Sequence, residues 1–188
     1  MRKYCRGAVS LWRYADDWVC AFECENDAQR FFRAVEQRLK KFKLELSPEK
    51  TQTIQFNRID GGKLSFDFLG FEFRWGRDRN NKPHLKRRTS PKKFRKSIRA
   101  FTDWCRTHRN MHIGLMFKSL CLKLRGYYNY YGIVGNSLAI SRFHHIVKAI
   151  LHKWLNRRSD RKSYTWAGFH ELLRHFKLPL PLVQPKRR

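Results

Sequence analysis

The stretch RYADDWV, residues 13–19, places two adjacent carboxylates, Asp16 and Asp17, between segments typical of β-strands. Aspartate is depleted from strands, and two neighbouring carboxylates repel each other. The flanking segments AVSLWR (residues 8–13) and WVCAFE (residues 18–23) predict a β-hairpin with the pair near its tip. Such a pair needs a nearby cation, and Mg²⁺ held together with substrate phosphates is the commonest solution. An Asx turn between two strands is the simpler alternative.

The rest of the first half predicts one amphipathic helix and several more strands. We expect Asn26 to cap the helix, whose apolar residues follow helical spacing through Phe42 with basic residues on the other side. Strands are predicted within LELSPEKTQTIQF (residues 44–56, with a turn at Ser47–Pro48), within LSFDFLGFEFRW (residues 64–75, bent at Gly70) and at residues 84–87, with a further turn at residues 60–62.

The second half predicts helices only. Pro91 is expected to begin the first of them, because residues at helical spacing from Phe94 to His108 share one face. Three more are predicted over residues 113–131, after Asn136, and from Thr165. The expected fold class is therefore α+β. An antiparallel sheet with one long helix fills residues 1–90, and an all-α helical bundle fills residues 91–188.

Charge points to a polyanionic partner. The 188 residues carry 42 Lys and Arg against 15 Asp and Glu, a formal net charge of +27. Nucleic acid is the usual partner for an excess of this size. From Lys86 onward there are 25 basic residues and only three acidic ones, so the carboxylates and the basic surface belong to different halves. No apolar run approaches the length of a membrane-spanning helix, so we expect no membrane partner.

The five cysteines form no CxxC pair. This usage is typical of a reduced, cytoplasmic protein without a zinc ribbon or a disulfide framework. His108 and His112 are spaced four apart, but a helix break is expected between them, so solvated or capping histidines are favoured over a metal site.

Several motifs in a fixed order resemble a known family. YADD (residues 14–17), a basic amphipathic helix, LSPEKT (residues 46–51) and FDFLGFEF (residues 66–73) follow the order of a reverse transcriptase palm. With LRGYYNYYG (residues 124–132) and KWLNRRSDRKSYTWAGF (residues 153–169), nearly the whole chain resembles group II intron-encoded reverse transcriptase/maturases. The resemblance implies an RNA-directed DNA polymerase, a nucleotidyltransferase, with the second half of the palm in residues 1–90 and the thumb and maturase region in residues 91–188.

The resemblance also implies roles for individual residues. Asp16 and Asp17 would bind Mg²⁺ in a two-metal site, and Lys50 would lie near the leaving pyrophosphate, although an exposed turn lysine is an equal alternative. Positions near the primer end and the incoming nucleotide would be Tyr14, Ala15, Phe68, Leu69 and Gly70, where packing in the palm core is the alternative for Phe68.

One departure from the family decides what we expect of the activity. In the family another metal-binding aspartate lies on an earlier strand and is preceded by the fingers, whereas only thirteen residues precede Tyr14 here. Asp27, Asp60 and Asp67 have no matching context. We therefore expect the C-terminal part of such a protein, with an incomplete Mg²⁺ site and no polymerase activity alone, whose missing N-terminal half would act in trans.

RNA is the partner that the helical half is expected to bind, as intron RNA and as RNA template with DNA primer. The candidate contacts are Lys92, Lys93, Arg95, Lys96, Arg99, Arg125, Tyr128, Arg157, Arg158, Arg161 and Lys162. Tyr127 and Tyr131, four apart, favour helix packing instead. A maturase-only module that assists intron splicing without DNA synthesis is the main alternative function. A basic binder with a chance YADD does not account for the order of the motifs.

Overall fold

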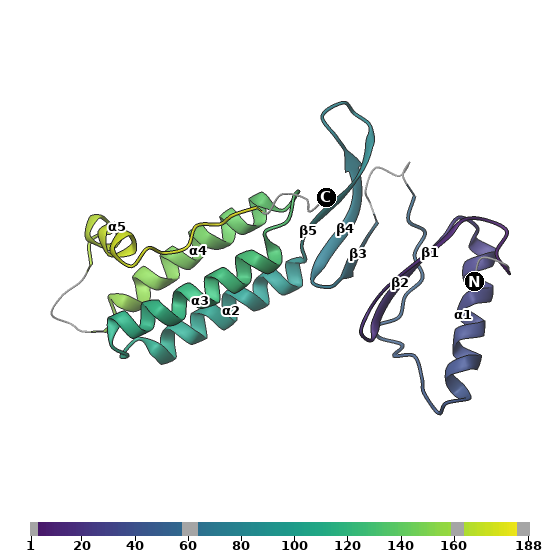
Figure 1. Ribbon diagram of the computed structural model, residues 1–188, viewed down its shortest axis with the longest axis horizontal. Helices are drawn as coiled ribbons and strands as arrows, with labels where there is room; N and C mark the ends of the chain where they lie inside the picture. Colours follow the sequence, from purple (N-terminus) through teal and green to yellow (C-terminus); the bar gives the residue numbers. More distant parts are fainter. Residues whose placement is uncertain (1–3, 58–63, 159–163, 184–188) are drawn as a thin grey trace. The chain divides into compact units, whose positions relative to one another are not determined.

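The computed structural model (Figure 1) describes residues 4–57, 64–158 and 164–183. The chain divides into two compact units, residues 1–60 and 61–188. The first unit contains β1 (Val9–Tyr14), β2 (Asp17–Phe22) and α1 (Glu25–Lys40). The second contains β3 (Ser65–Phe68), β4 (Phe71–Arg77), β5 (Pro83–Thr89), α2 (Pro91–His108), α3 (Ile113–Tyr131), α4 (Ser137–Leu155) and α5 (Trp166–His175).

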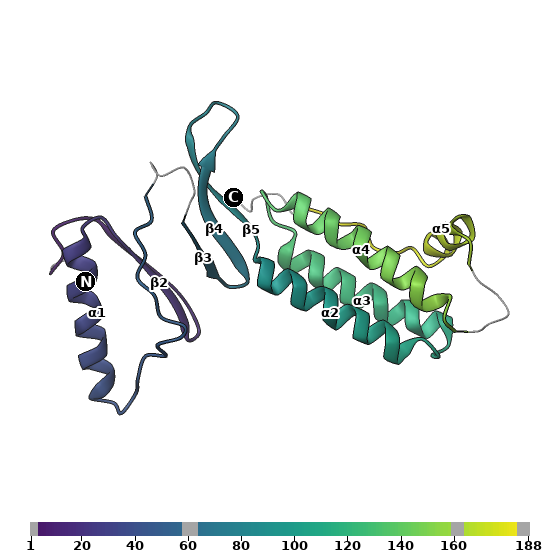
Figure 2. The same ribbon diagram turned by 180° about the vertical axis from the view of Figure 1, so that it is seen from behind.

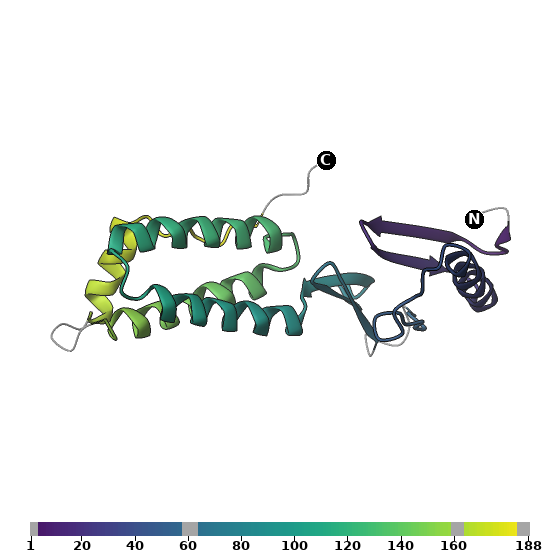
Figure 3. The same cartoon turned by 90° about the horizontal axis from the view of Figure 1, so that it is seen from below.

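The first unit is a hairpin covered on one face by a helix. β1 and β2 pair antiparallel from Val9 opposite Phe22 to Tyr14 opposite Asp17, and α1 lies against them (Figure 3). Phe31 of α1 meets Phe22 with ring centroids 5.2 Å apart. No apolar side chain among the described residues of this unit is fully buried. The hairpin was predicted, but α1 begins one residue before Asn26 and has Cys24 at its N-cap.

Residues 44–57 form no strand, so the strand pair predicted there is wrong. The segment contains a turn in which the N–H of Lys50 donates to the carbonyl of Ser47 at 3.1 Å. Alternating side chains make a strand only where a neighbouring strand satisfies the backbone N–H and C=O groups. In the described part of the first unit, β1 and β2 pair only with each other.

The sheet of the second unit has the order β3-β4-β5, with both pairs antiparallel. The strands predicted around Gly70 and at residues 84–87 are confirmed, and the bend at Gly70 is a tight turn that reverses the chain between Phe68 and Phe71. The turn predicted at residues 60–62 lies outside the described residues.

The four helices predicted for the second half are all present. α2, α3 and α4 run side by side, with α5 at the end of the bundle farther from the β3-β4-β5 sheet (Figure 2). Thr165 caps α5, because its hydroxyl accepts a hydrogen bond from the N–H of Gly168 at 3.2 Å. The core of the bundle consists of residues from these helices, including Phe101, Met116, Phe117, Leu120, Leu124, Val147, Leu151 and Phe169.

The expected α+β class is confirmed, with two small antiparallel sheets and five helices in the described residues. The domain boundary predicted between residues 90 and 91, which separates the palm part from the thumb and maturase region, coincides with the start of α2. This division into domains stays a prediction. Among the described residues, every helix is too short or too polar to cross a membrane.

Candidate functional site

The tip of the first hairpin presents two solvent-exposed carboxylates. Asp16 lies in the two-residue loop after Tyr14, and Asp17 is the first residue of β2. Ala15 has a φ of 51°, a left-handed conformation that an alanine adopts only at a cost of about 1 kcal/mol. The guanidinium of Arg13 donates from Nε to the carbonyl of Ala15 at 2.9 Å and so braces the loop. Exposed carboxylate oxygens fit the ligand preference of Mg²⁺.

Lys50, the candidate partner of the leaving pyrophosphate, lies in the turn after Ser47 with its side chain exposed. In the described part of the chain no ion pair or hydrogen bond joins its ammonium group to Asp16 or Asp17. The role of Lys50 near the leaving pyrophosphate stays a prediction.

The other aspartates with known surroundings already have partners. The buried Asp27 accepts hydrogen bonds from the N–H groups of Arg6 (2.7 Å) and Gly7 (3.1 Å) and forms an ion pair with Arg30. The N–H of Gly7 and then the Arg30 side chain hold the pKa of Asp27 below its usual value. Asp67 accepts a hydrogen bond from the hydroxyl of Ser90, and Asp60 lies outside the described residues. Within the described ranges, no three His, Cys, Asp or Glu residues cluster as a metal site.

The tight turn at Leu69 and Gly70 is the second candidate element. Leu69 has a φ of 51° and Gly70 a φ of 78°, so both residues of the loop are left-handed, as a type I′ hairpin requires. A methyl group on Gly70 would lie 3.0 Å from the Tyr131 hydroxyl. The N–H of Ser90 donates to the Gly70 carbonyl at 2.9 Å. The turn is therefore fitted closely against the start of α2 and the end of α3.

Two tyrosines of the LRGYYNYYG motif fasten this turn. The hydroxyl of Tyr130 donates to the Leu69 carbonyl at 2.8 Å, and its ring stacks on Phe71 with centroids 5.8 Å apart. Tyr131 meets the same phenylalanine edge-on at 5.3 Å. The structure thus brings together two motifs that the sequence presents about sixty residues apart. Tyr130, half-exposed here, was not among the predicted contacts.

Tyr128 is buried, so the prediction that it contacts RNA does not fit its position. Only 3% of its surface is exposed, and its hydroxyl is hydrogen-bonded to Nδ1 of His144 at 2.7 Å. Burial raises the pKa of Tyr128 and lowers the pKa of His144, which keeps both groups neutral. Tyr127 stacks on Phe143 in the same core, in agreement with the packing role favoured for it.

The predicted cations of α2 are all exposed. They form what we call the cationic face of α2, which consists of Lys92, Lys93, Arg95, Lys96 and Arg99. Arg125 of α3 is exposed as well. The one acidic residue of α2, Asp103, lies farther along the helix and pairs with Arg106 at 3.3 Å. The cationic face therefore has no carboxylate of its own helix within its span.

The cations after α4 divide into three cases. Arg157 is exposed, with its guanidinium 5.4 Å from the Trp154 ring. Arg158 donates to the carbonyl of Met111 at 2.8 Å and so ties the end of α4 to the loop before α3. Arg161 and Lys162 lie outside the described residues. A structural contact therefore accounts for Arg158, while Arg157 remains a candidate for RNA contact.

Comparison with known families gives two matches in one chain. Residues 1–73 match the reverse transcriptase (RNA-dependent DNA polymerase) family, and residues 91–171 match the group II intron, maturase-specific domain. A comparison with curated proteins found no significant match. The first match contains the carboxylate hairpin and the Leu69–Gly70 turn. The second contains the cationic face of α2 and the tyrosines that hold that turn.

Proposed function

Because the chain belongs to the group II intron reverse transcriptase/maturase family, we propose that it binds intron RNA through its helical region. The observation that carries this proposal is the cationic face of α2, which is exposed throughout. The same face is suited to the RNA template and DNA primer that a reverse transcriptase of this family would hold. Phosphate contacts from such a face supply affinity without reading sequence.

Helix stability does not explain this face. Lys92, Lys93 and Arg95 lie in the first turns of α2, where the helix dipole disfavours positive charge, and this end of α2 carries no acidic residue. Lys92 and Lys96 are also four apart, a spacing at which like charges repel by a few tenths of a kcal/mol, roughly 0.2–0.5. A cluster that opposes the stability of its own helix is better explained by an external polyanion.

We expect RNA binding to weaken when three cations of this face, Lys92, Lys96 and Arg99, are neutralised together. In the variant Lys92→Gln/Lys96→Gln/Arg99→Gln, affinity for a structured intron RNA should fall by about ten- to a hundredfold at moderate salt. The steepness of log K against log[salt] should decrease by about 2–3, because the variant makes fewer phosphate contacts and its binding therefore releases fewer counterions from the RNA. Fluorescence anisotropy over a KCl series measures both quantities.

The matched control is Lys118→Gln/Lys153→Gln/Arg174→Gln, which removes the same charge from exposed positions on three other helices. It should change affinity much less. Equal losses in the two variants would show that net charge alone draws RNA, and an unchanged affinity in the α2 variant would overturn the proposed interface.

We also propose that Asp16 and Asp17 supply ligands to a Mg²⁺ site for which no further His, Cys, Asp or Glu of the described residues joins the pair. Two observations support this: both carboxylates are exposed at the hairpin tip, and Asp27 and Asp67 already have partners. Bound Mg²⁺ would polarise the substrate phosphate and stabilise the leaving group. The chain's own contribution is to hold the two carboxylates at one end of a braced hairpin.

Primer extension tests this second proposal. The purified chain with Mg²⁺ and an annealed primer and template should give no extension. A polypeptide that carries the fingers and the first palm aspartate, added in trans, should restore it. Asp16→Asn should then abolish synthesis, because one metal ligand is lost, while the control Asp103→Asn should not. Extension by the chain alone, or by the complemented Asp16→Asn variant, would contradict the proposal.

A further inference from the structure

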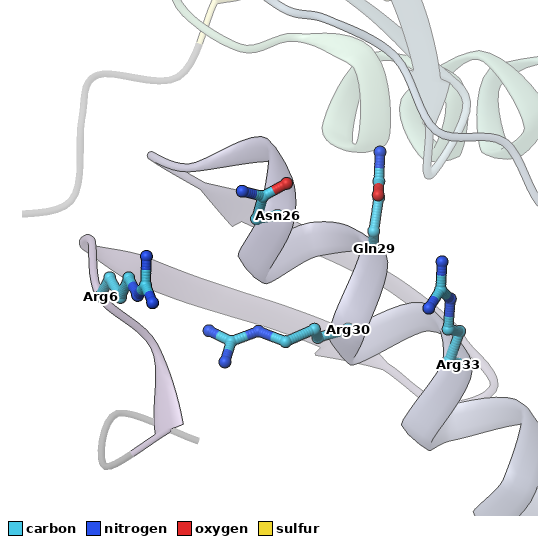
Figure 4. Close-up of a pocket in the computed structure, with 5 residues that line it drawn as sticks. All are labelled: Arg6, Asn26, Gln29, Arg30 and Arg33. Atoms are coloured by element: carbon cyan, nitrogen blue, oxygen red, sulfur yellow. The ribbon is translucent and has the colours of Figure 1, made fainter.

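A hollow lined by three arginines lies beside the start of α1, in the first unit. Its volume is about 290 Å³, and its lining residues are Arg6, Asn26, Gln29, Arg30 and Arg33 (Figure 4). We propose that this hollow is a second binding site for RNA, which takes one phosphate group of the backbone. The inference rests on the proposed function only in that the phosphate belongs to RNA.

The buried carboxylate of Asp27 joins the two segments of the chain that line this site. Its Oδ2 accepts the N–H groups of Arg6 and Gly7, which fixes the backbone of the segment before β1 against the first turn of α1. Its Oδ1 pairs with Nη2 of Arg30. One buried group therefore contacts the backbone of Arg6 and the side chain of Arg30, which stand twenty-four positions apart in the sequence.

Arg30 is held ready to bind a further oxygen. Its Nη2 donates both to Asp27 and to the carbonyl of Tyr4, the latter at 3.1 Å. A guanidinium has five N–H donors in a planar fork, and no hydrogen bond to a described residue uses Nε or Nη1 of Arg30, so these two atoms can donate to a ligand. Because these contacts fix the side chain beforehand, binding costs less conformational entropy than it would for a mobile arginine.

Arg6 and Arg33 supply charge that the described structure leaves unneutralised. Neither side chain has an ion pair with a described residue, and both residues line the same hollow as Arg30, whose guanidinium points toward Arg6 (Figure 4). The nearby carboxylate of Glu25 accepts a hydrogen bond from Gln29 at 3.2 Å. Three cations around one opening repel each other, and an anion between them relieves that repulsion.

The lining also limits the class of ligand. Every lining residue is polar or charged and none is aromatic, so the hollow offers no ring on which a base would stack. Guanidinium forks and side-chain amides match the oxygens of a phosphate. A backbone phosphodiester thus fits the lining better than a nucleoside does.

The variant Arg6→Gln/Arg33→Gln of the full chain tests the site with oligouridylate, which offers phosphates without a fixed fold. We expect affinity to fall about three- to tenfold, and the salt slope to decrease by about 0.7, the value for one phosphate contact on a single strand. The control Lys40→Gln/Lys41→Gln removes the same charge from the other end of α1 and should lower affinity less than about twofold. Arg6→Lys/Arg33→Lys keeps the charge but loses the fork, so we expect it to recover only part of the affinity.

Equal effects of the two glutamine variants, or full recovery with lysine, would overturn the proposal in favour of general charge attraction. Titration with pyrophosphate is a second experiment, which distinguishes a free phosphate from an RNA phosphate as the ligand of the hollow. If it binds in a manner dependent on Arg6 and Arg33 while oligouridylate affinity is unchanged in the variant, the hollow serves a free phosphate and not RNA. A loss of affinity only in the α2 variant would refute this site and leave the proposed function intact. Circular dichroism confirms that each variant is folded.

Discussion

Replacement of Phe117 by alanine should lower the free energy of unfolding of the helical region by about 3–5 kcal/mol. Phe117 is 1% exposed, at the centre of the core shared by the helices, and its ring stacks on Phe176 with centroids 4.3 Å apart. The substitution removes the buried ring and leaves a cavity that the surrounding helices fill only in part. Urea unfolding followed by far-UV circular dichroism measures the change.

Leu122→Ala provides the control on the same helix. Leu122 is 62% exposed, so its truncation leaves no cavity and should change stability by less than about 0.5 kcal/mol. Similar losses for the two variants would mean that α3 is not packed through Phe117. Since the cationic face of α2 depends on this core for its position, the Phe117 variant should also lose affinity for RNA as it unfolds.

Asn136→Ala should destabilise the same region by about 3–5 kcal/mol for a different reason. The side chain of Asn136 is 1% exposed and makes three hydrogen bonds, each 2.8 Å long. Its Oδ1 accepts from the N–H of Thr89, and its Nδ2 donates to the Thr89 hydroxyl and to the carbonyl of Tyr131. Alanine leaves these polar groups without their partner in a buried place, where each lost bond costs about 1–3 kcal/mol.

Asn129→Ala, at an exposed position of α3, is the matched amide deletion and should have little effect. Asn136→Asp separates the individual bonds. It keeps the acceptor for Thr89 but loses both donors and buries a charge, so it should be at least as unstable as the alanine variant. A loss below about 1 kcal/mol in Asn136→Ala would show that water replaces the amide.

Helical spacing and short alternating runs predicted most of the fold. Each helix of the bundle buries one face, so apolar residues recur along the sequence at helical spacing, a pattern that can be recognised without the structure. The strands predicted at residues 44–56 failed because pairing depends on a neighbouring strand, which a local pattern does not reveal. Asn136 was correctly placed before α4, yet its amide bonds to β5 and α3 instead of capping α4, a role that sequence spacing cannot predict.

The candidate sites were predictable to different degrees. Asp16 and Asp17 stand in a local motif, and the structure places them at a hairpin tip as expected. Tyr128 and Tyr130 differ by two positions in a run of tyrosines, and only the packing of α3 decides that the first faces His144 and the second Leu69. The arginine hollow depends on a buried carboxylate that joins distant segments, so no sequence motif marks it.

The fastening of the Leu69–Gly70 turn has a mechanical consequence. Tyr130 and Tyr131 attach the turn to the end of α3, and Ser90 attaches it to the start of α2, so the turn cannot shift without these helices. Its separation from the cationic face is therefore fixed by the protein and not by the ligand. A nucleic acid that contacts both the turn and the cationic face would therefore have a fixed number of nucleotides between its two points of contact.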